Sequence, residues 1–202
     1  MNRATDLCTS VSRALAWAAG LILLATATLI TLDVVFRGLL RSTYFESFEL
    51  SAYAFAIATS LGFAYALTSK AHVRIEIAYN LLSTRWRAVL DVYAHACLAL
   101  VAGVLTYWGG VTVLASMEIG ARSNSTLAVP LALPQSLWLV GLAWFFATAL
   151  VFTLAGAYAL ARGRAAEANL LLGVPTPETE MSQSAPEVAA APAQAQALAE
   201  TA

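Results

Sequence analysis

Four long apolar stretches without charged residues alternate with short polar segments along the chain. A helix needs about 20 mostly apolar residues to cross the hydrocarbon core of a bilayer. The uncharged stretches cover residues 14–32, 50–69, 92–117 and 123–161. The first extends to Phe36 if Asp33 lies in its last turn. The pattern therefore predicts an all-α protein with four membrane-spanning helices.

The last stretch is longer than one crossing needs, and two prolines divide it. Pro130 and Pro134 stand near its beginning. A proline inside a helix loses a hydrogen bond and clashes with the preceding turn, so we expect the last helix to start near Gln135. The four spans are then predicted at about residues 14–36, 49–69, 90–117 and 135–161.

Composition supports a membrane protein and excludes several other classes. Of 202 residues, 60% are hydrophobic and 11% are charged, whereas a soluble domain has roughly 25% charged residues. The net charge is −1, so no basic surface for nucleic acid is expected. The lipid bilayer is the expected surroundings of the helices.

The distribution of basic residues predicts the orientation. Eight Lys and Arg residues fall at the N-terminus, between the second and third spans, and after the fourth, against three on the other side. Because basic loops stay in the cytoplasm, both termini are predicted to be cytoplasmic. We interpret the first span as an uncleaved signal anchor; cleavage near residues 25–27 is the alternative.

The end of the chain differs in character from the rest. From Val174 it is rich in Ala, Gln, Glu and Pro and has no aromatic residues. Such a composition cannot build a core. We predict a membrane domain over residues 1–165 and a mostly disordered cytoplasmic tail over residues 166–202.

Few polar residues stand near the spans, and three gather around the first connection. Asp33 and Arg37 are four residues apart, which places them on one helix face where they can pair. Asp33 can instead contact a partner, or Glu49 at the same membrane level. Glu49 opens the second span, where an acid complements the helix dipole.

Two further features are candidates for packing or docking. In residues 70–77, His72, Arg74 and Glu76 alternate with apolar residues, which suits a strip that docks another subunit or a solvated loop. The second span carries small residues at every fourth position, Gly62 among them. Small residues at this spacing allow close helix contacts, although an Ala-rich chain also produces them by chance.

No motif for catalysis, phosphate binding or metal binding is recognisable. Cys8 and Cys97 have no redox or metal spacing. A haem held by His72 and His95 is disfavoured, because one is expected in a loop and the other near a helix end. We therefore expect no cofactor and no enzyme activity.

Several short segments resemble the small membrane subunit of tripartite ATP-independent periplasmic (TRAP) transporters, the DctQ type. The resemblance runs from about residue 14 to 161 and rests on residues 32–37 (LDVVFR), 48–53 (FELSAY), 62–66 (GFAYA), 72–76 (HVRIE), 125–130 (STLAVP) and 133–134 (LP). Two positions depart from it: Phe48 replaces the first acid of a Glu-Glu pair, and Glu76 replaces an Asp.

The resemblance implies a partnership in the bacterial inner membrane. Members of this family work with a large membrane subunit, which carries organic acids and sodium, and with a periplasmic solute-binding protein. The small subunit is implied to brace the large one and to help dock the binding protein. Asp33, Arg37 and Glu49 would face the periplasm, and His72, Arg74 and Glu76 the cytoplasm.

The alternatives are a self-assembling small transporter, a membrane anchor of an enzyme complex and a membrane assembly factor. The middles of all four spans lack charge, and substrate pathways in membranes usually show charged groups there. This favours the accessory subunit. Nothing in the chain identifies the substrate.

Overall fold

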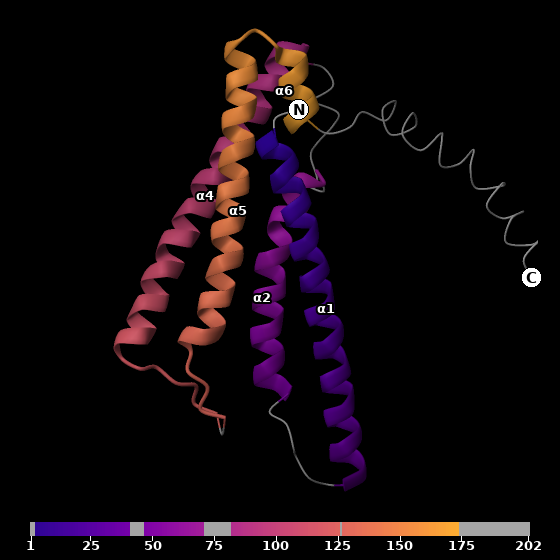
Figure 1. The fold of residues 1–202 in the computed structure, drawn as a ribbon, viewed down its shortest axis with the longest axis vertical. Coiled ribbons are helices and arrows are strands. Elements are labelled where there is room, and N and C mark those ends of the chain that lie inside the picture. The colour runs from indigo at the N-terminus through magenta and orange to yellow at the C-terminus, as the bar shows by residue number, and fades with distance from the viewer. Residues whose placement is uncertain (1–2, 41–46, 71–81, 126, 174–202) are drawn as a thin grey trace, which may run out of the picture.

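The computed structural model describes residues 3–40, 47–70, 82–125 and 127–173 as a bundle of long helices (Figure 1). The predicted all-α fold is confirmed, and four of the described helices are long and apolar enough to cross a membrane. The elements are α1 (Arg3–Leu40), α2 (Ser47–Thr68), α4 (Thr84–Glu118), α5 (Ala132–Ala161) and α6 (Ala165–Leu172).

The long helices extend beyond the apolar runs that predicted them. α1 begins at Arg3 and α4 at Thr84, so both include charged residues before the apolar part. The uncharged run marks the length that crosses lipid, whereas a helix can continue into the polar interface. α5 begins at Ala132, earlier than the expected Gln135. Pro134 falls in the first turn, where the missing N–H has no helical partner to lose.

The bundle consists of two helical hairpins, α1 with α2 and α4 with α5, joined chiefly by contacts between α2 and α5. The main core cluster lies where α2, α4 and α5 meet. Its buried members are Ala64, Leu67, Ala99, Ala102, Phe145 and Ala149. The many alanines allow the backbones to approach, which is how helices associate when lipid is as apolar as their side chains.

A glycine sets the closest approach between the two hairpins. A Cβ atom on Gly141 of α5 would lie 2.3 Å from Ser60 Oγ and 2.8 Å from the Ser60 carbonyl carbon. A side chain at residue 141 would therefore push α2 away. Within the α4–α5 hairpin, Gly109 similarly receives the ring of Trp138, with 3.1 Å between that ring and a Cβ at residue 109.

The packed body extends beyond the predicted boundary at residue 165. Residues 165–172 form α6, which folds back and contacts α4 and α5. Ala168 and Leu172 are buried in these contacts. The start of the predicted tail, residues 166–172, therefore belongs to α6, whose apolar residues find a complementary site on the bundle; that the tail is mostly disordered stays a prediction. The remainder of the predicted tail, residues 174–202, lies outside the described residues.

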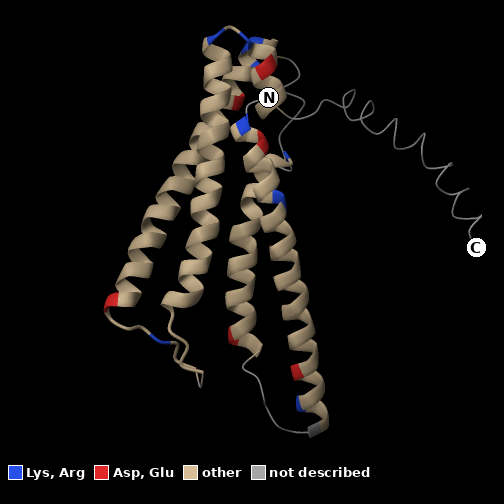
Figure 2. Ribbon diagram, in the orientation of Figure 1, with Lys and Arg blue, Asp and Glu red and all other residues tan. Residues whose placement is uncertain are grey.

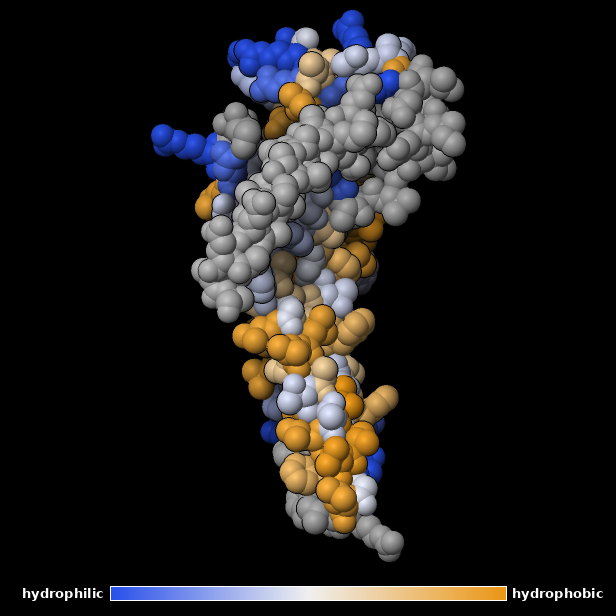
Figure 3. All heavy atoms as spheres, turned by 90° about the vertical axis from the view of Figure 1, so that its right-hand side faces the viewer, coloured by the Kyte–Doolittle hydropathy of each residue, from blue (hydrophilic) through white to orange (hydrophobic). Residues whose placement is uncertain are grey.

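Charged residues gather towards the two ends of the described helices (Figure 2). One end, called here the α6 end, contains α6, the start of α1 and α4, and the end of α2 and α5. The opposite end, called the corner end, contains the end of α1, the start of α2 and the α4–α5 connection. Figure 3 shows hydrophobic side chains along the bundle towards the corner end and hydrophilic ones gathered at the α6 end.

Candidate functional site

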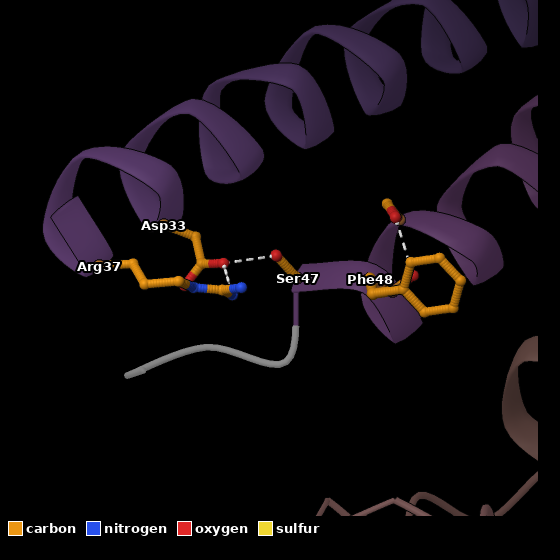
Figure 4. A network of polar contacts seen from close by, with 5 residues as sticks. Asp33, Arg37, Ser47 and Phe48 are labelled. Atoms are coloured by element: carbon orange, nitrogen blue, oxygen red, sulfur yellow. Dashed lines mark hydrogen bonds and ion pairs between the residues drawn. The ribbon is translucent and has the colours of Figure 1, made fainter. Parts of the chain in front are cut away.

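A buried carboxylate joins α1 to α2 at the corner end (Figure 4). Asp33 is 2% exposed, and its Oδ2 accepts hydrogen bonds from Arg37 Nη2 at 2.5 Å and from Ser47 Oγ at 2.6 Å. Arg37 lies one turn further along α1 and is 55% exposed. Hydrogen bonds to an ionised group are the stronger kind, and here they hold the last turn of α1 against the first turn of α2.

The predicted pairing of Asp33 with Arg37 is present. Ser47 was not expected from the sequence, although a serine at a helix start is a common signal for a side chain that bonds locally. In the structure, the Ser47 hydroxyl instead donates to the carboxylate of Asp33, which lies 14 residues earlier in the chain, on the other side of the connection. Next to it, the Ser51 hydroxyl donates to the Phe48 carbonyl at 2.8 Å (Figure 4).

Glu49 takes part in a different contact from that of Asp33. Its Oε1 accepts a hydrogen bond from the Tyr53 hydroxyl at 2.6 Å, one turn along α2. The hydroxyls of Ser123 and Ser125, in the α4–α5 connection, lie near the same carboxylate. Glu49 therefore bonds within α2, close to the other hairpin, and stands at the favourable end of the helix dipole.

The proline segment forms the entry to α5. Pro130 pairs with Arg122 in an isolated antiparallel bridge, and Leu131 N donates to Ala121 O at 3.0 Å. The Arg122 guanidinium also donates to Ala128 O at 3.1 Å. The connection is thereby folded back on itself next to Glu49, and Pro134 lies in the first turn of α5 beyond it.

Of the remaining predicted site residues, Gly62 is the one that lies in the described part of the chain. A Cβ on Gly62 would meet nothing within 4 Å, so this glycine faces open space on α2. Nearby Ala58, from the same row of small residues, is buried. His72, Arg74 and Glu76 lie outside the described residues, so their docking role stays a prediction.

A second polar cluster, at the α6 end, was not singled out as a site. Asp91 and His95 of α4 are both buried, and His95 Nδ1 lies 2.9 Å from the Asp91 carbonyl oxygen. The sequence signal was a four-residue spacing near the start of an apolar helix. Within the described ranges, no group of three or more His, Cys, Asp or Glu side chains is placed to hold a metal ion.

The polar contacts at the corner end thus join helices and connections; their geometry suits a structural or docking role. Comparison with known proteins gives the family. The model of the family described as tripartite ATP-independent periplasmic transporters, DctQ component, matches residues 26–158. No curated protein and no solved structure matches the chain. The match covers α2, α4, most of α5 and the second part of α1 from residue 26, and it includes the corner, the proline segment and the α2–α5 crossing. The chain therefore belongs to the DctQ family and is the small membrane component of a TRAP transporter.

Proposed function

We propose that this chain braces the large membrane subunit of its transporter, and that its corner end helps to dock the periplasmic binding protein. The transported solute is an organic acid taken up with sodium, as the family resemblance implies. The chain lies in the bacterial inner membrane with both termini in the cytoplasm. The observation that carries the proposal is the distribution of polar groups over a largely apolar bundle.

The outer faces of the helices suit contact with another apolar surface. Large side chains such as Leu21 and Leu24 on α1, Leu100 on α4 and Leu154 on α5 are exposed. Charged residues of the described segments stand towards the helix ends (Figure 2). Such a body offers packing area, and lacks the charged groups near the middle of the membrane that usually mark a substrate path.

The orientation follows from the charges at the two ends. Among the described residues, the α6 end carries seven Lys and Arg residues and the corner end carries two. Cytoplasmic segments carry the excess of basic residues. The corner end then faces the periplasm, where the Asp33 network and the folded α4–α5 connection form a fixed platform for a soluble partner.

Photo-crosslinking in native membranes tests the bracing role. A photoreactive amino acid replaces Leu21, Leu100 or Leu154, one on each of three outer faces, in separate variants. We expect at least one face to give a crosslinked product with a much larger membrane protein, identified by mass spectrometry as the large subunit. A variant at buried Ala149 is the matched control and should give no such product.

Two outcomes would favour the alternatives. Crosslinks only between copies of this chain would favour a self-assembling transporter. Crosslinks to an enzyme subunit, with a haem absorption band in the purified complex, would favour an enzyme anchor. Either outcome would contradict the proposed bracing role.

A further inference from the structure

We propose that α6 is a clasp that holds α1, α4, α5 and the segment just after α2 together at the α6 end, and that it opens as a unit to uncover the polar cluster of Asp91 and His95. This inference does not depend on the bracing role. It concerns a short helix that follows the last membrane span and lies beyond the residues matched to the family.

Two long-range hydrogen bonds hold α6 by its backbone and its polar side. Lys70 Nζ, just after α2, donates to the Leu170 carbonyl at 2.7 Å. The last carbonyls of a helix lack helical partners and favour a cation, so Lys70 acts on the end of α6. On the other side, Asn169 Nδ2 donates to the carbonyl of Thr84, the first residue of α4, at 3.0 Å.

Lys70, which donates to the Leu170 carbonyl, has an unusual backbone conformation. Its φ is +57°, in the left-handed region, which costs a non-glycine residue energy. α2 ends two residues earlier, and a left-handed residue just past a helix end is usually glycine. A lysine at this position is consistent with a contact that compensates for the strain.

Apolar packing of Leu172 against Gly156 complements these hydrogen bonds. A Cβ on Gly156 of α5 would lie 2.2 Å from Leu172 Cδ1 and 3.3 Å from Val92 Cγ2 of α4. The leucine therefore occupies space that the missing side chain of Gly156 leaves free. Cys8 and Phe152 belong to the same packed cluster as Leu172. Cys8 comes from the start of α1, so α1, α4 and α5 all contribute side chains to the seat that α6 occupies.

The polar cluster lies under the end of this clasp. The position that a Cβ on Gly173 would take is 3.3 Å from Asp91 Oδ2. Asp91 and His95 are both buried, and α6 packs against α4, the helix that carries them. Lifting α6 would therefore give water access to an acid and an imidazole beside it.

α6 depends on this seat for its own structure. It has eight residues, whereas isolated helices shorter than about 12–15 residues are marginal in water. Undocking and unfolding of α6 are therefore one cooperative step. Short units of this kind open more often than the whole protein unfolds.

The native Cys8 reports on the clasp. It is 7% exposed in the seat, whereas Cys97 is exposed. In a Cys97→Ser background, the full chain in detergent micelles is treated with a maleimide and the labelling rate of Cys8 is measured. Leu172→Ala should raise the rate at least about tenfold, because truncating a buried leucine generally weakens packing by more than the equivalent free energy. Leu170→Ala is the matched control, since Leu170 is 74% exposed on the same helix, and should leave the rate unchanged.

A second variant keeps the proposal testable if Leu172→Ala prevents folding. The double substitution Lys70→Met with Asn169→Ala removes both side-chain hydrogen bonds that hold α6 and leaves the packing of Leu172 against Gly156 in place. This variant should also accelerate Cys8 labelling while the thermal unfolding of the bundle stays cooperative. Equal labelling of the parent and of either folded variant would overturn the clasp, as would an equal rise for Leu172→Ala and Leu170→Ala.

Discussion

The two ends of the bundle are held together by different physical means. At the α6 end, the main contact is apolar: Leu172 of α6 fills the space left by Gly156, and two hydrogen bonds to backbone carbonyls supplement it. At the corner end, the Asp33 carboxylate and the Ser47 hydroxyl join α1 to α2, and the Glu49 carboxylate bonds to Tyr53 at the start of α2. Apolar packing depends on volume, whereas a polar contact depends on having a partner for each charge. Substitutions at the two ends should therefore fail in different ways.

The crossing of α2 and α5, which lies between the two ends, should show the largest effect. Gly141→Ala places a methyl group 2.8 Å from the Ser60 carbonyl carbon, so the two hairpins must separate. Overpacking of this kind costs about 1–3 kcal/mol. Thermal unfolding in detergent should show a clear loss of stability.

The matched control is Gly62→Ala on α2. Nothing lies within 4 Å of the new methyl group, and alanine is the better helix former. Stability should be unchanged or slightly higher. Equal destabilisation by both substitutions would contradict the proposed close approach at residue 141.

Removing the Asp33 carboxylate should cause the second largest loss of stability, and it tests the contacts at the corner end separately from those elsewhere. Asp33→Asn keeps an acceptor for Arg37 and Ser47 but removes its charge, so each hydrogen bond falls from about 1.5–3 kcal/mol to about 0.5–1.5 kcal/mol. A double-mutant cycle with Ser47→Ala measures the link between α1 and α2 separately from the rest. A coupling free energy close to zero would show that the Asp33–Ser47 contact does not hold the corner.

A smaller effect is expected for the hydrogen bond between α1 and α5. Trp144 Nε1 donates to the buried Ser12 hydroxyl at 3.1 Å. Ser12→Ala should cost about 0.5–1.5 kcal/mol of unfolding free energy. Ser136→Ala, whose hydroxyl bonds only within the first turn of α5 among the described contacts, should cost less. A reversed order would contradict the account.

The smallest effect is expected at the surface of the clasp. Arg164 and Glu167 form an exposed ion pair at 3.3 Å. Such pairs contribute about 0–1 kcal/mol. Glu167→Gln should therefore leave both the thermal unfolding and the Cys8 labelling rate of the Cys97→Ser chain nearly unchanged, and a large rise in labelling would show that the clasp rests on this pair.

The fold was more predictable than the contacts between helices. Uncharged runs identify the four spans because lipid tolerates few charges. They could not give the start of α1 or α4, since charged residues also continue a helix beyond the membrane. α6 was missed because its eight residues carry little signal alone, and what holds it is a space beside Gly156, 16 residues from Leu172 in the chain.

The candidate site was partly predictable for a similar reason. Asp33 with Arg37 follows from helical spacing, which is a local property. Ser47 on Asp33, and Ser123 with Ser125 near Glu49, depend on how separate helices cross. No spacing rule reports such crossings.

Co-purification tests the central claim most directly. The full chain, tagged, is isolated from native membranes in mild detergent, and the accompanying proteins are identified and quantified by mass spectrometry. The account predicts a large multi-helix membrane subunit in near-equal amount. Recovery of this chain alone, under conditions that keep other membrane complexes together, would contradict it.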